Sequence, residues 1–241
     1  MASNELVTMD IAQLPSTQVG SDDQFKELAK GTDFLGRLDL FTKGKLVNKG
    51  LVRPGNYGIP EGEGVEDLGP SVDIVPLARR PKALDMSDTD AIIAVYDPEN
   101  EEFQRIAAAS AEADSHCMYG PSFLVFERST GRFLELFCGT KSKRAEANKI
   151  YPYLPLTEKD IVARKLGDQK PHGPIPLTLG SRLIEKSTFS WHVPVVSKCS
   201  TPISNFPTMD KVVKEITAFL TFKGDGVEKV AEAAGKPARK R

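Results

Sequence analysis

The sequence predicts a mainly β protein with inserted helices, an α+β fold in which a mostly antiparallel barrel or sandwich carries two or three helices. Many short apolar runs are bounded by glycine and proline, which is typical of strands separated by turns. The helical segments do not alternate regularly with these runs, so a doubly wound α/β sheet is not expected. We expect a β-rich core domain over residues 34–206 and a C-terminal amphipathic helix over residues 207–222.

The clearest strand signal is a β-hairpin in the middle of the chain. Residues 122–128 (SFLVFER) and 132–137 (RFLELF) are apolar and aromatic runs, and a turn containing Gly131 joins them. A helix over residues 142–151 follows, which either Thr140 or Ser142 can cap. Free backbone N–H groups at a helix start, next to basic side chains, indicate a phosphate ligand.

The other elements follow from alternation, helical spacing and loop composition. Further strands are predicted over residues 34–40, 71–78, 91–96, 177–184 and 188–196, and helices over residues 101–114 and 209–222. Residues 43–53 are predicted as a second strand pair with a cationic face, and residues 55–70 as an acidic loop. Residues 157–173 are predicted as a loop or a partly helical excursion. Pro76 places its strand at a sheet edge, because proline cannot donate a hydrogen bond to a strand ladder.

The composition limits the surroundings and the ligands of the protein. A net charge of −1 over 241 residues gives no overall basic field, so any surface for nucleic acid must be a local patch. The three cysteines have no close spacing, which favours a reducing, intracellular setting. Without a signal peptide or a membrane-spanning run, we expect a cytoplasmic protein, in the host cell if it is viral. Residues 1–33 and 223–241 are predicted as a flexible arm and a flexible basic tail.

No catalytic or metal-binding pattern stands out, so we expect neither an enzyme nor a cofactor. The sequence contains no nucleophile elbow and no C-x-x-C pair, and the neighbours His116 and Cys117 are poorly placed to ligate one metal ion together. Residues 139–144 (GTKSKR) lack the spacing of a Walker loop, so nucleotide hydrolysis is not predicted.

Clustered cations are the candidate contacts to a polyanion. They lie in the predicted strands and at the start of the helix that follows the hairpin: Lys43, Lys45, Lys49, Arg53, Arg79, Arg80, Lys82, Lys141, Lys143 and Arg144. On adjacent strands, the first seven would form one basic face for backbone contacts. Protection of sheet edges by charge explains the strand cations equally well, and ordinary solvated charge explains those at the helix start.

Aromatic residues near these cations are candidates for base stacking, which contributes ~1–3 kcal/mol per base. Those considered are Tyr57, Tyr96, Tyr119, Phe123, Phe126, Phe133, Phe137 and Trp191. Phenylalanines in strands are mostly core residues, so the hairpin phenylalanines carry little weight. Trp191 is as consistent with a core position as with an exposed stacking platform.

Three segments carry a resemblance to known proteins: residues 118–126 (MYGPSFLVF), 137–144 (FCGTKSKR) and 190–195 (SWHVPV). Over residues 34–206 the chain resembles phage- or plasmid-encoded single-stranded DNA-binding proteins of the OB class. The resemblance implies an OB-like antiparallel barrel and a role in DNA replication or recombination. Many members of that class end in an acidic tail, whereas this chain ends in the basic sequence KPARKR.

The function predicted from the sequence is therefore non-catalytic binding of single-stranded nucleic acid, with DNA favoured over RNA. The cations would contact the backbone, and Trp191 would stack on bases. A homo-oligomer is possible, and no membrane partner is expected. The alternative is a viral structural or assembly protein, in which the β domain and mobile arms make subunit contacts.

Overall fold

The computed structural model describes residues 35–87, 92–112, 114–187, 190–201 and 205–222, so the predicted arm and basic tail lie outside the described residues. One sheet contains β1 (Gly36–Arg37), β5 (Ser71–Asp85), β6 (Ile93–Val95), β7 (Cys117–Glu127), β8 (Arg132–Phe137), β9 (Leu177–Glu185) and β10 (Ser190–Lys198). A smaller sheet contains β2 (Asp39–Leu40), β3 (Tyr57–Glu61) and β4 (Gly64–Gly69). The helices are α1 (Lys45–Asn48), α2 (Glu101–Ala109), α3 (Lys141–Ala147), the 3-10 helix η3 (Tyr151–Tyr153), α4 (Glu158–Arg164) and α5 (Met209–Thr221).

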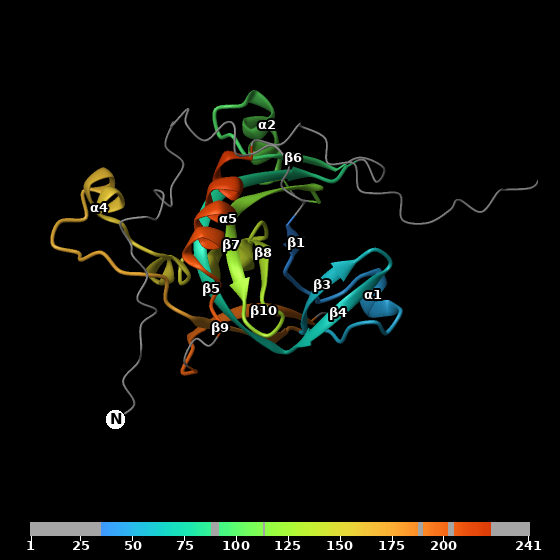
Figure 1. Ribbon diagram of the computed structural model, residues 1–241. Coiled ribbons are helices and arrows are strands. Elements are labelled where there is room, and N and C mark those ends of the chain that lie inside the picture. Colours follow the sequence, from blue (N-terminus) through green and yellow to red (C-terminus); the bar gives the residue numbers. More distant parts are fainter. Residues whose placement is uncertain (1–34, 88–91, 113, 188–189, 202–204, 223–241) are drawn as a thin grey trace, which may run out of the picture.

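The larger sheet is mixed and has seven strands in the order β1-β8-β7-β5-β9-β10, with β6 paired to β5 (Figure 1). Only β1 and β8 pair in parallel, and the other pairs are antiparallel. Strands β1 and β10 lie at the two ends of this strand order. Because they do not pair with each other, the described strands form no closed barrel. The molecule is thus mainly β with added helices, which confirms the predicted α+β class.

Strand β5 is the centre of this sheet rather than an edge, which corrects the prediction made from Pro76. It spans 15 residues, pairs with β7 along its length, and pairs with β9 and β6 near its two ends. The pairing register with β7 shifts between Pro76 and Ala78. Proline is tolerated in a sheet at such a bulge, because the local ladder is already interrupted there.

The two faces of the larger sheet are covered by different elements. On one face, here called the α3 face, strand residues such as Phe123 and Val125 pack with Ala147 of α3, Ile150 and the smaller sheet. On the other, the α5 face, Leu77 and Phe126 pack against the apolar side of α5. Helix α2 forms a separate small core near the C-terminal end of β5, where Phe103 and Ile106 of the helix pack with Ala83 and Val95. Cross-strand pairs place Arg79 and Pro81 of β5 on the α3 face, and Arg80 and Lys82 on the α5 face.

Most strongly patterned elements form as predicted, and two further predictions, for residues 43–53 and 55–70, were wrong. The central hairpin, the hairpin of β9 and β10, strand β6, and helices α2 and α5 lie where the sequence placed them. Residues 43–53 were predicted as two strands but contain the short helix α1. Residues 55–70 were predicted as a loop but form the β3–β4 hairpin, in which Tyr57 and Ile59 are buried while Gly62 turns the chain at φ 56°. The predicted 157–173 excursion contains α4.

A buried carboxylate, Glu135 of β8, joins three strands and α5 on the α5 face. One of its oxygens lies 2.6 Å from the Nζ atom of Lys82, and the other accepts from Ser122 Oγ at 2.6 Å and lies 3.3 Å from Arg80 Nη2. Arg80 Nη1 also donates to the carbonyls of Phe219 and Phe222 at the end of α5. Side chains of Arg80, Lys82 and Glu135 are at most 7% exposed, so these charges compensate one another.

Glu135→Gln should therefore lower the free energy of unfolding by about 3–5 kcal/mol, because it leaves Arg80 and Lys82 buried without their counter-charge. Urea denaturation at neutral pH measures the loss. Glu61→Gln is the matched control, since Glu61 pairs with Arg132 at the surface and should change stability by about 1 kcal/mol at most. A Glu135→Gln protein as stable as the unaltered chain would contradict this account.

A second buried carboxylate, Glu127, fixes the turn of the central hairpin. It accepts hydrogen bonds from the backbone N–H and the hydroxyl of both Ser129 and Thr130. Burial alone would raise the pKa of Glu127, but these hydrogen bonds hold it below its ordinary value of 4.5. A lowered folded-state pKa contributes stability above pH 4.5, and that contribution is lost as the pH falls through the folded pKa.

We expect Glu127→Gln to reduce stability at neutral pH and to flatten the loss of stability between neutral pH and about pH 3. Urea denaturation across this range compares the two proteins. Glu63→Gln, at an exposed turn position, is the control. If the Glu127→Gln protein lost stability with acid as steeply as the parent chain, the turn carboxylate would not carry this pH dependence.

Candidate functional site

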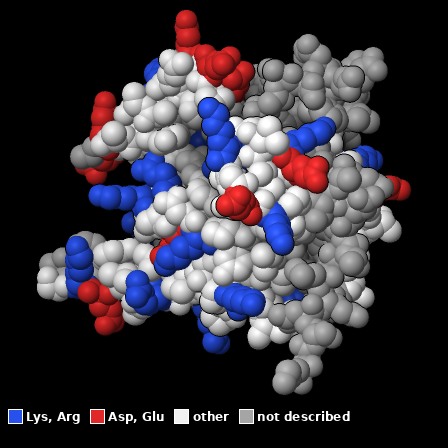
Figure 2. Space-filling model, turned by 90° about the vertical axis from the view of Figure 1, so that its left-hand side faces the viewer, with Lys and Arg blue, Asp and Glu red and all other residues white. Residues whose placement is uncertain are grey.

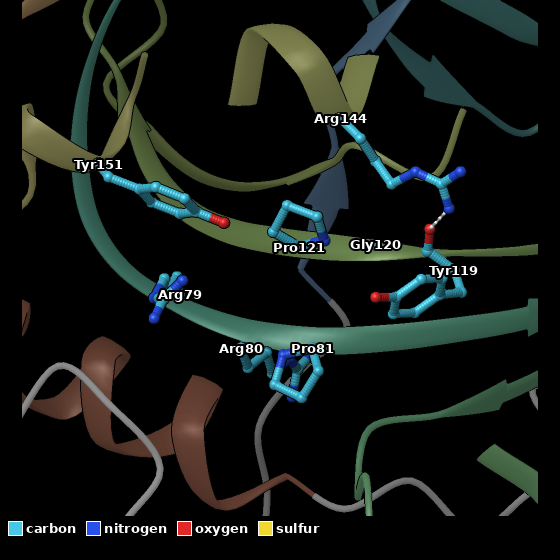
Figure 3. Close-up of a pocket in the computed structure, with 8 residues that line it drawn as sticks. All are labelled: Arg79, Arg80, Pro81, Tyr119, Gly120, Pro121, Arg144 and Tyr151. Carbon is cyan, nitrogen blue, oxygen red and sulfur yellow. Dashed lines mark hydrogen bonds between the residues drawn. The ribbon is translucent and has the colours of Figure 1, made fainter. Parts of the chain in front are cut away.

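A cleft of about 370 Å³ opens on the α3 face, over β5 and β7 and beside α3 (Figure 3). Its lining residues are Arg79, Arg80, Pro81, Tyr119, Gly120, Pro121, Arg144 and Tyr151. Figure 3 places Arg79 and Tyr151 at one end of the cleft and Arg144 and Tyr119 at the other. Among the described residues that line the cleft there is no Asp or Glu, although the buried guanidinium of Arg80 pairs with Glu135 on the other face of the sheet.

Each end of the cleft holds an arginine stacked on a tyrosine. The Arg79 Cζ atom lies 4.5 Å from the centre of the Tyr151 ring, and the Arg144 Cζ atom lies 5.3 Å from the centre of the Tyr119 ring. Arg144 Nη1 also donates to the backbone carbonyl of Tyr119 at 2.6 Å. Both guanidinium groups are thus held in place before any ligand arrives, and Tyr119 remains 40% exposed.

Local structure explains why these four side chains meet. Helix α3 begins after Thr140, whose hydroxyl accepts from the Lys143 N–H, which confirms Thr140 as one of the two predicted caps. Arg144 of α3 and Tyr151 of η3 both follow β8 in the chain, and both lie over the same face of the sheet. At the far end, the Tyr119 ring packs edge-on against Phe103 of α2, with ring centres 6.2 Å apart.

Gly120 allows α3 to approach the floor of the cleft. A Cβ atom added there would clash with the carbonyl oxygen of Cys138 and would lie 3.1 Å from Arg144 Cγ. Only glycine permits this close approach, which sets the position of Arg144 relative to Tyr119.

The structure separates the predicted cations of the helix start. Lys141 is exposed at the first residue of α3, and Arg144 enters the cleft. Lys143 instead lines a small apolar pocket with Tyr57 and Cys138. Burial raises the pKa of the Cys138 thiol to about 12, and the nearby Lys143 charge opposes that rise. The predicted cluster therefore contributes one side chain, Arg144, to the cleft.

The predicted basic face of the strands does not form, because β5 directs its cations to opposite faces. Arg79 lies in the cleft (Figure 3). Arg80 and Lys82 are instead buried against Glu135 on the other face. Burial alone would lower the pKa of Lys82, but the adjacent Glu135 carboxylate raises it above its ordinary value. Arg80 lines the cleft as part of β5. Its guanidinium, however, donates hydrogen bonds to the Phe219 carbonyl of α5 and to Glu135.

The cations of residues 43–53 lie apart from β5. Lys43, Lys45, Lys49 and Arg53 are exposed on and beside α1, next to the smaller sheet, and none of them lines the cleft. On the face that Figure 2 shows, Lys and Arg are interspersed with Asp and Glu rather than gathered into one stripe. Local geometry, not a broad basic surface, therefore distinguishes the cleft.

Trp191 lies on β10, opposite Ile184 of β9, and is half-buried. The Lys186 Nζ atom lies 5.8 Å from the centre of its ring. The indole is not among the described residues that line the cleft. Its predicted stacking role thus concerns a different part of the surface.

Sequence reasoning included Tyr119 among the candidate stacking residues but missed Tyr151. No helical spacing in the structure relates Tyr151 to Arg144, because α3 ends at Ala147 and Tyr151 begins the separate 3-10 helix η3. Its pairing with Arg79 depends on the packing of η3 beside β5, which no local pattern reports.

Comparison with models of known protein families, with curated proteins and with solved structures finds no match for this chain. Within the described ranges, no group of three or more His, Cys, Asp or Glu side chains is placed to hold a metal ion. Over the same part of the chain, no helix combines the length and apolar character needed to cross a membrane.

Gly120→Ala should destabilise the fold by about 1–3 kcal/mol, because the new methyl group has no room beside the Cys138 carbonyl. Thermal unfolding followed by circular dichroism measures the change. Gly180→Ala is the matched control in another strand, since its Cβ would meet only the Val195 carbonyl oxygen at 4.0 Å. Equal stability of the two variants would show that the close approach at Gly120 is not a constraint.

Proposed function

We propose that this chain is a non-catalytic single-stranded DNA-binding protein that acts in replication or recombination, and that the strand passes through the cleft on the α3 face. The supporting observation is that Arg79 and Arg144 each stack on a tyrosine in one cleft. The described residues that line this cleft include no Asp or Glu. Guanidinium groups bind phosphate bidentately, and unstacked bases stack on tyrosine rings and on guanidinium planes.

A single strand suits this site better than a duplex. Stacking on Tyr119 or on the outer plane of Arg79 requires a base with a free face, which a base pair inside a duplex does not offer. The cleft floor, which includes Pro81, Gly120 and Pro121, brings little hydrogen-bonding capacity to read base edges. Binding at the cleft is thus expected to tolerate different sequences. The OB-like barrel that the resemblance implies is not needed for this proposal, which rests on the cleft.

The expected contribution of the cleft is modest and measurable. Each arginine that neutralises one phosphate of a single strand contributes ~0.7 to the slope of log affinity against log salt concentration. Two such contacts give a slope of about 1.4, and each stacked base adds ~1–3 kcal/mol.

Arg79→Ala combined with Arg144→Ala should weaken binding to a fluorescein-labelled oligothymidylate at least tenfold and reduce the salt slope by about 1.4. Fluorescence anisotropy across a salt series measures both quantities. Arg37→Ala is the matched control, since Arg37 is an exposed arginine of β1 beside Asp39 and does not line the cleft. Its affinity and slope should equal those of the parent chain.

Arg79→Lys with Arg144→Lys separates charge from stacking. Lysine keeps the charge but not the planar guanidinium, so the salt slope should be retained while affinity falls. The proposal is wrong if the parent chain binds no single strand at low salt. It is also wrong if removing both arginines leaves the slope unchanged.

A further inference from the structure

A second pocket adjoins the cleft at Tyr151. This pocket has a volume of about 210 Å³. Its lining residues are Tyr151, Pro152, Leu154, Pro155, Leu156, Arg164, Leu166, Gln169 and His172. Tyr151 belongs to the lining of both cavities, so the two cavities adjoin at this residue.

The second pocket is framed by specific hydrogen bonds. Leu156 and His172 exchange two backbone hydrogen bonds of 2.9 and 3.0 Å, which tie together the two ends of the α4 excursion. A capping box between Thr157 and Asp160 fixes the start of α4, with both side chains buried. Arg164 lies in the last turn of this helix and Gln169 in the loop after it.

The chemistry of the second pocket differs from that of the cleft. It combines an apolar floor with one guanidinium and two side chains, Gln169 and His172, that can hydrogen-bond to a base edge. His172 Nδ1 lies 2.8 Å from the Gly173 carbonyl. When Nδ1–H donates to that carbonyl, the neutral ring presents Nε2 as an acceptor, which suits the N–H groups of a base. No Asp or Glu is among the described residues that line this pocket.

We propose that the second pocket is a base-reading subsite for the neighbouring nucleotide of the same single strand. Arg164 contacts that nucleotide's phosphate, while Gln169 and His172 contact its base edge. This inference rests on the proposed function of the cleft and adds base preference to it. The cleft holds the strand without regard to sequence, and the subsite discriminates between bases at the adjacent position.

Arg164→Ala combined with Gln169→Ala tests the subsite, because both side chains are exposed and neither takes part in the capping box. Fluorescence anisotropy is measured with labelled homopolymers of dA, dC and dT, each about three and about twelve nucleotides long. The parent chain should bind one twelve-nucleotide homopolymer at least fivefold more tightly than the others. The variant should lose that preference while its affinity for the three-nucleotide oligomers stays within twofold.

Lys159→Ala is the matched control, since Lys159 is an exposed cation of α4 that does not line the pocket. Arg164→Gln is a second variant that retains side-chain length and helix propensity, and it should weaken binding of long oligomers only. If both variants bind every oligomer as the parent does, the subsite is refuted while the cleft stands. If the parent binds no oligomer, or cleft variants bind as tightly as the parent, the proposed function itself fails.

Discussion

The buried charge of Glu135 is the constraint on which the rest of the structure depends. A carboxylate removed from water needs opposite charge and hydrogen bonds, and Arg80, Lys82 and Ser122 supply them. Burial would raise the pKa of Glu135, but the charges of Lys82 and Arg80 hold it below its ordinary value. This one cluster fixes the pairing of β5, β7 and β8. Since Arg80 also donates to carbonyls at the end of α5, the cluster fixes the position of that helix on the sheet as well.

That constraint determines which cation of β5 lies in the cleft. Side chains alternate between the faces of a strand, and a shift of one residue would send every side chain to the opposite face. With Arg80 and Lys82 bound to Glu135, Arg79 is directed to the α3 face, where it meets Tyr151. The basic run in the sequence is thus two features: an internal counter-charge, and a single arginine in the cleft.

Local patterns predicted much of the fold but little of the cleft. The central hairpin and α5 follow from alternation and helical spacing, which are properties of short segments. The central position of β5 did not follow, because the bulge beside Pro76 depends on the partner strand. The burial of Lys82 could not be predicted from local patterns either, because its partner Glu135 lies 53 residues away along the chain. Arg79 and Arg144 were among the predicted contacts, but only tertiary packing distinguishes them from the solvated or buried cations around them.

The charge of the whole chain bears on how such a cleft would work. At a net charge of −1 the molecule has little long-range attraction for a polyanion, so a strand would be captured by contact rather than by steering. Capture by contact favours groups that need little rearrangement on binding. Arg144 meets that condition, because its guanidinium is already fixed by the Tyr119 ring and the Tyr119 carbonyl, and Arg79 meets it on Tyr151. In the proposed function, preorganisation of a few cations would substitute for the broad basic surface that the composition does not provide.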